Sequence, residues 1–125
     1  MKITHYLHTA ILVADLARSE QFYSQVLGLT KIDRSLKYPG VWYELGSTQI
    51  HLIVDTELKW NLQNAEKWGR NPHLALAVED LEAAKAVLIE QGYEVQLSAS
   101  GRPALFTQDP DGNVIELTQV VEPEV

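Results

Sequence analysis

The chain of 125 residues contains no cysteine. That absence excludes a disulfide framework, a thiolate metal site and a cysteine nucleophile. It also lacks any apolar run close to the roughly 20 residues that a membrane span requires. Two early histidines, His5 and His8, stand where a signal peptide would carry its apolar core. We therefore expect a cytoplasmic protein that does not insert into a membrane.

Positive charge is also scarce. The chain has 10 Lys and Arg residues against 17 Asp and Glu residues, for a formal net charge of −7. This net negative charge repels a phosphate backbone, and no local cluster of Lys and Arg offsets it. Nucleic acid is therefore not an expected partner, whereas a small-molecule substrate is. The length suits one domain, or two small halves that share a core.

A repeat with an offset of 65 residues organises the chain. The segment 8–16, HTAILVADL, aligns with 73–81, HLALAVEDL, and Ile50-His51-Leu52 aligns with Ile115-Glu116-Leu117 at the same shift. Two matches at one shift, whose first residues lie more than forty positions apart, indicate an internal duplication. We predict a single domain over 1–125, with one module at about 1–56, a linker at about 57–69 and a second module at about 70–121.

Each module has the pattern of one strand, one helix and three further strands. Asp15 and Asp80 are predicted helix N-caps, and Gly28 and Gly92 are predicted helix ends. Hydrophobic periodicity and turn residues give the remaining boundaries. The class is therefore α+β, with two tandem βαβββ modules related by pseudo-twofold symmetry and forming a barrel-like cleft. The expected strands are 5–13, 30–36, 41–46, 48–54, 72–79, 94–98, 104–108 and 113–120, and the expected helices are 16–27 and 81–91.

Four polar residues occupy equivalent positions in the two modules. Because side chains alternate along a strand, His8 and His73 share their faces with small alanines, opposite the large aliphatic residues. His51 and Glu116 each lie between two aliphatic residues and point away from the apolar face. A symmetric metal site requires such recurrence, whereas histidines with a structural role and a solvated glutamate do not. We predict that these four side chains bind one divalent metal ion.

Two runs in this chain form recognisable motifs: 8–29, HTAILVADLARS…FY…VLGL, and 109–117, DPDGNVIEL. They resemble the vicinal oxygen chelate superfamily, which includes glyoxalases, bleomycin-resistance proteins and extradiol dioxygenases. The resemblance implies paired βαβββ modules, with metal ligands from the first and fourth strands of each. These positions are His8, His51, His73 and Glu116. It also implies a homodimer, in which the two modules that complete a site can come from different subunits.

The resemblance implies a metal that chelates two neighbouring oxygens of a small substrate, and Fe, Mn, Ni, Co and Zn all suit nitrogen and oxygen ligands. The two histidines and one carboxylate of His8, His73 and Glu116 match extradiol dioxygenases, so dioxygenase chemistry is slightly favoured. Bacterial glyoxalase I differs at three positions. It carries a glutamate where this chain has His51, an arginine where it has Leu12 and an asparagine where it has Asp55.

Two alternatives remain open. One is glyoxalase I-like (lactoylglutathione lyase) or epimerase-type isomerisation by proton transfer, and the other is a metal-free drug- or metabolite-binding protein of the bleomycin-resistance type. In the enzyme, Glu116 is a ligand and candidate base, and His51 a ligand or acid–base group. Arg102 is a candidate anchor for an anionic substrate, or else a solvated loop residue. Trp42 and Phe106 are candidate walls of an apolar pocket, or else core residues.

Overall fold

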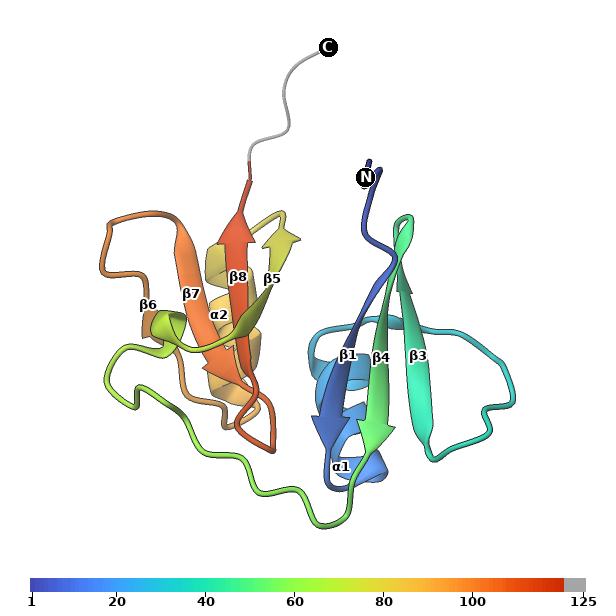
Figure 1. The fold of residues 1–125 in the computed structure, drawn as a ribbon. Coiled ribbons are helices and arrows are strands. Elements are labelled where there is room, and N and C mark those ends of the chain that lie inside the picture. Colours follow the sequence, from blue (N-terminus) through green and yellow to red (C-terminus); the bar gives the residue numbers. More distant parts are fainter. Residues whose placement is uncertain (121–125) are drawn as a thin grey trace. The chain divides into compact units, whose positions relative to one another are not determined.

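The computed structural model describes residues 1–120, and the chain divides into two compact units, residues 1–59 and 60–125. Each unit has one four-stranded mixed sheet with a helix packed on one face (Figure 1). The predicted α+β class and the paired βαβββ modules are confirmed. The predicted end of module two, residue 121, lies outside the described residues. Within residues 1–120, no helix is both long and apolar enough to cross a membrane.

The first unit has its strands in the order β1-β4-β3-β2. Strand β1 runs parallel to β4, and the other neighbours are antiparallel. This order places the first and fourth strands of the module side by side, so Ala10 and His51 are direct partners. The elements are β1 (His8–Val13), α1 (Leu16–Glu20), the π-helix η1 (Gln21–Val26), β2 (Thr30–Lys31), β3 (Gly40–Leu45) and β4 (Thr48–Val54).

The second unit repeats this topology with the order β5-β8-β7-β6. Here Ala75 and Glu116 are direct partners on the parallel strands β5 and β8, at the positions that the 65-residue offset predicts. The elements are the 3-10 turn η2 (Trp68–Arg70), β5 (His73–Val78), α2 (Leu81–Glu90), β6 (Gln96–Leu97), β7 (Ala104–Gln108) and β8 (Val114–Gln119).

Both predicted N-caps are confirmed. A carboxylate oxygen of Asp15 accepts the Arg18 amide at 2.9 Å, and Asp80 accepts the Ala83 amide at 3.0 Å. The first helix differs from the prediction, since only its first five residues are α-helical and the rest is η1. The Leu27 amide bonds to the Phe22 carbonyl, five residues back, at 2.9 Å. This wider turn lets the consecutive aromatics Phe22 and Tyr23 both be fully buried.

Two predicted strands are shorter than expected. The segments 30–36 and 94–98 contain only Thr30–Lys31 and Gln96–Leu97 as strands. Each pairs on one side only, with β3 or with β7. Short edge strands leave few unpaired backbone groups, which limits edge-to-edge association.

Within the predicted linker, 57–69, residues 60–69 belong to the second unit and pack against it. The Trp60 indole donates to the Gly112 carbonyl at 3.1 Å. Trp68 is buried in a cluster with Phe106 and Val114. Gly69 packs so tightly that an added Cβ would lie 2.6 Å from the Phe106 ring. This segment therefore covers part of the sheet face that carries Glu116.

Candidate metal centre

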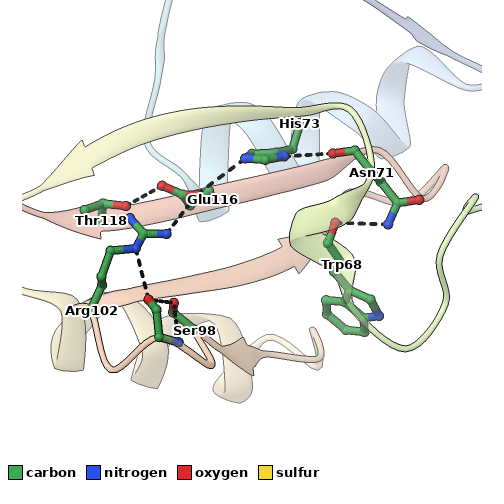
Figure 2. A network of polar contacts seen from close by, with 8 residues as sticks. Trp68, Asn71, His73, Ser98, Arg102, Glu116 and Thr118 are labelled. Atoms are coloured by element: carbon green, nitrogen blue, oxygen red, sulfur yellow. Dashed lines mark hydrogen bonds and ion pairs between the residues drawn. The ribbon is translucent and has the colours of Figure 1, made fainter.

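His73 and Glu116 lie on adjacent parallel strands and face each other. Nε2 of His73 is 3.4 Å from Oε1 of Glu116 (Figure 2). On its other side the imidazole donates Nδ1–H to the backbone carbonyl of Asn71 at 2.8 Å. Because a neutral imidazole has one N–H, this bond leaves the Nε2 lone pair directed at Glu116.

The second carboxylate oxygen of Glu116 is already occupied. Thr118 Oγ1 donates to Oε2 at 2.6 Å, which orients the carboxylate so that Oε1 faces His73. Arg102 Nη2 lies 3.7 Å from Oε1 as well, so a cation already approaches this oxygen. Glu116 is only 9% exposed. A carboxylate this buried requires either its hydrogen bonds or a positive neighbour.

The His73–Glu116 pair fits a metal ion. Both facing atoms are acceptors, one nitrogen and one oxygen, which is a donor set suited to first-row divalent metals. Ligands roughly 2.0–2.2 Å from a tetrahedral metal are roughly 3.3–3.6 Å apart. The observed separation of 3.4 Å matches that spacing. The Asn71 and Thr118 contacts are the kind of outer hydrogen bonds that hold metal ligands in orientation.

The two predicted ligand histidines of the first unit, His8 and His51, form an aromatic stack. His51 lies between Trp42, with ring centroids 3.8 Å apart, and His8, with ring centroids 4.1 Å apart. The guanidinium of Arg34 lies 4.1 Å above the other face of Trp42. Since imidazole lone pairs lie in the ring plane, two rings inclined by only 14° do not direct their nitrogens at one point. Metal binding by both would require one ring to turn.

The surroundings of His51 favour its neutral form. Burial lowers the pKa of His51, and the nearby His8 and Arg34 lower this pKa further. Nε2 of His51 donates to the side-chain carbonyl of Gln49 at 2.8 Å, so the lone pair of the neutral ring is on Nδ1. His51 is therefore available as a ligand or as a proton acceptor through Nδ1.

The predicted ligands thus lie two in each unit. Neither unit alone, within residues 1–120, gathers three His, Asp or Glu side chains that could share a metal ion. Each unit supplies half of the predicted set of four.

The other predicted site residues border two hollows. One, of about 480 Å³ in the first unit, is lined by His8, His51 and Trp42. The other, of about 540 Å³ in the second unit, is lined by Arg102 and Phe106. Trp42 borders the first hollow and Phe106 the second, and each also packs on a histidine of its own unit.

Sequence reasoning missed the residues that orient these side chains. Gln49 and Thr118 lie two positions from His51 and Glu116, on the same strand faces, so alternation was a signal for both. Asn71 had no such signal, because it acts on His73 through its backbone carbonyl. Its buried side chain donates to the carbonyls of Asn64 and Trp68 and accepts from the Asn64 amide.

Paired βαβββ modules with His and carboxylate side chains on their first and fourth strands define a recognisable class of protein. Residues 5–117 match the family described as the Glyoxalase/Bleomycin resistance protein/Dioxygenase superfamily. The chain belongs to this superfamily, as its sequence motifs predicted.

Its relatives include lactoylglutathione lyases. It is 28% identical to the probable lactoylglutathione lyase of Vibrio cholerae, with 90% of this chain and 88% of that one covered. It is 31% identical to the lactoylglutathione lyase of Escherichia coli O157:H7, with 90% of each covered. Among solved structures, a putative glyoxalase family protein from Bacillus anthracis has a TM-score of 0.76 and 25% identity, over 97% of this chain and 98% of that one.

Proposed function

We propose that this chain is a divalent-metal-dependent enzyme of the lyase or isomerase type. It moves a proton between adjacent carbons of a small substrate that bears two neighbouring oxygens. The slight preference for a dioxygenase that the two histidines and one carboxylate suggested is given up, because the relatives named above are lactoylglutathione lyases.

The facing His73 and Glu116 side chains carry the proposal. Their 3.4 Å contact joins two acceptor atoms that each retain a lone pair, while the remaining polar atoms of both side chains are hydrogen-bonded elsewhere. With His73 neutral, the pair leaves a position for a cation between a nitrogen and an oxygen.

The roles of the residues follow from their surroundings. His73 and Glu116 would hold Fe, Mn, Ni, Co or Zn, together with His8 and His51 from a first unit. A bound divalent ion supplies Lewis acidity, which lowers the energy of negative charge developing on a chelated substrate oxygen. Glu116 would take the proton from one substrate carbon and return it to the next, so that the net reaction is an isomerisation.

His51 can contribute in either of two ways. Its neutral ring can bind the metal through Nδ1, or it can accept and return a proton there as a second acid–base group. The resemblance to bacterial glyoxalase I implies a glutamate at this position and an arginine where this chain has Leu12. The substrate is therefore proposed to differ from the glutathione adduct that those enzymes use.

Because each unit holds two of the four predicted ligands, a complete set needs one first unit and one second unit. We propose a homodimer in which these can come from different copies of the chain. This arrangement makes the oligomeric state part of the active site rather than an incidental property.

The test begins with protein purified without chelators and analysed for metal content. The apoprotein is loaded with Ni, Co, Zn or Mn, and deuterium exchange at carbon is followed by NMR in D₂O. The substrates are hemithioacetals of methylglyoxal with several thiols, and 2-methylmalonyl thioesters. In parallel, protein loaded anaerobically with Fe(II) is given a panel of catechols while oxygen uptake is recorded.

The expected result is one metal per complete site and metal-dependent exchange that falls by about 10²- to 10⁴-fold in Glu116→Gln. Glu90→Gln, at the exposed end of α2, is the matched control and should retain full exchange. Oxygen uptake with a catechol, without deuterium exchange at carbon, would instead support dioxygenase activity. Tight ligand binding that is unchanged by metal removal and by His73→Ala would instead identify a metal-free binding protein.

A further inference from the structure

A hollow of about 540 Å³ in the second unit is not used by the proposed proton transfer. It lies between the segment that contains η2 and the loop joining β6 to β7. Its apolar wall includes Leu97 and Phe106, and hydroxyl groups of Ser98 and Ser100 line it as well.

Basic residues gather at this hollow. Lys67, Arg70 and Arg102 all line it, and the only other basic residue between positions 60 and 120 is Lys85 on α2. Acidic residues outnumber basic ones in that part of the chain, but only Glu66 lines the hollow. The hollow therefore concentrates positive charge in a protein whose formal net charge is −7. Such a focus of one sign raises the local concentration of ligands of the opposite sign.

Arg102 joins this hollow to the His73–Glu116 pair. Its Nε donates to Ser100 Oγ at 3.2 Å. Its Nη2 lies 3.7 Å from Oε1 of Glu116 (Figure 2). The side chain is 52% exposed, so its remaining N–H groups can reach a ligand. A guanidinium offers five N–H donors in a planar fork that matches a carboxylate or a phosphate.

We infer that this hollow binds an oxyanion group of the substrate, a carboxylate or a phosphate. Arg102 is the principal contact, Lys67 and Arg70 add charge, and a short apolar part of the substrate rests on Phe106. This assignment of a substrate class rests on the proposed function. The substrate is a small organic anion whose neighbouring oxygens lie next to the anionic group, because Arg102 contacts both the hollow and Glu116.

The experiment measures binding without turnover. Metal-free full-length protein is titrated with phenylacetate, benzylphosphonate and the neutral phenylacetamide, and the affinities are measured by calorimetry and by chemical shifts. We expect saturable binding of at least one of the two anions, weakening with added salt, and at least tenfold weaker binding of the amide. Which anion binds more tightly distinguishes a carboxylate site from a phosphate site.

Arg102→Gln should weaken anion binding at least tenfold, and Lys85→Gln, which changes a basic residue outside the hollow, should leave it within twofold. Thermal unfolding confirms that each variant is folded, and Arg70→Gln provides a second variant at the hollow with a smaller expected loss.

Equal binding of phenylacetate and phenylacetamide would overturn the inference. So would equal affinities of the Arg102 and Lys85 variants, or no saturable binding of either anion. Failure of the proposed function gives a different pattern, in which anion binding persists but no metal-dependent exchange occurs. Metal-dependent exchange on neutral substrates, without anion binding, would support the proposed function and contradict only the anion site.

Discussion

His73 and Glu116 approach each other across the parallel strands β5 and β8, with Nε2 and Oε1 3.4 Å apart. The same pair is flanked by Arg102 and Thr118 on the Glu116 side and by Asn71 on the His73 side (Figure 2). Each of the two proposed ligands in the second unit is therefore oriented by a separate partner, as outer hydrogen bonds orient metal ligands.

Thr118 orients the carboxylate of Glu116, which we propose as a metal ligand. Replacing it with valine removes the 2.6 Å hydrogen bond to Oε2 and keeps the carboxylate. We expect metal affinity to fall about 10- to 100-fold, the usual effect of losing an outer-shell partner. Metal titration of the apoprotein measures this. Thr30→Val, at an exposed position of β2, is the control. Equal affinity in both variants would show that Thr118 does not orient the ligand.

His51 gives the metal-free protein a pH-dependent stability. Its pKa is lowered in the folded state, whereas in the unfolded chain it titrates at about 6.5. Below that pH the unfolded state takes up the proton first, so the free energy of unfolding falls as pH drops from about 6.5 through the folded-state pKa. The contribution is fully present above pH 6.5.

Urea unfolding of apoprotein between pH 7.5 and 5 tests this effect. Wild type should lose more stability over that range than His51→Gln, which cannot titrate. Chemical shifts of the His51 ring should show a titration below that of a free histidine. Parallel pH profiles for the two proteins would contradict the prediction.

Replacing Asn71 should lower the stability of the protein and disturb the orientation of His73. The side chain is 3% exposed and bonds to the backbone of Asn64 and Trp68. Asn71→Ala leaves buried backbone groups unpaired, and we expect about 1–3 kcal/mol lower stability by urea unfolding. Metal affinity should fall as well, because the carbonyl that orients His73 loses its support. Asn61→Ala, at an exposed position, should change neither quantity.

Complementation tests whether a site is shared between copies. One variant carries His8→Ala and His51→Ala, and the other carries His73→Ala and Glu116→Ala, so each alone lacks half of the set. If first and second units of different copies combine, the mixed dimer contains one intact site. We then expect exchange activity to reappear after co-refolding, up to roughly half of the wild-type value per heterodimer. No recovery in a verified heterodimer would place each site within one chain.

Much of the fold could be predicted because it follows local rules. Asp15 and Asp80 cap their helices as predicted, and the 65-residue offset reappears in the pairing of Ala10 with His51 and of Ala75 with Glu116. The first helix was only partly predicted. Its change to η1 depends on burying both Phe22 and Tyr23, and helical periodicity alone does not indicate this.

The sequence by itself determined which polar side chains occupy equivalent positions in the two modules, and on which strand faces they lie. Alternation along a strand and the repeat offset depend only on residue order, and they selected His8, His51, His73 and Glu116. Only the tertiary structure decided the hydrogen bonding and the ring orientation of these side chains. The tautomer of His73 depends on the Asn71 carbonyl, and His51 stacks on Trp42 from the neighbouring strand. The positions of backbone carbonyls and the orientations of rings cannot be predicted from the sequence, because packing between segments sets them.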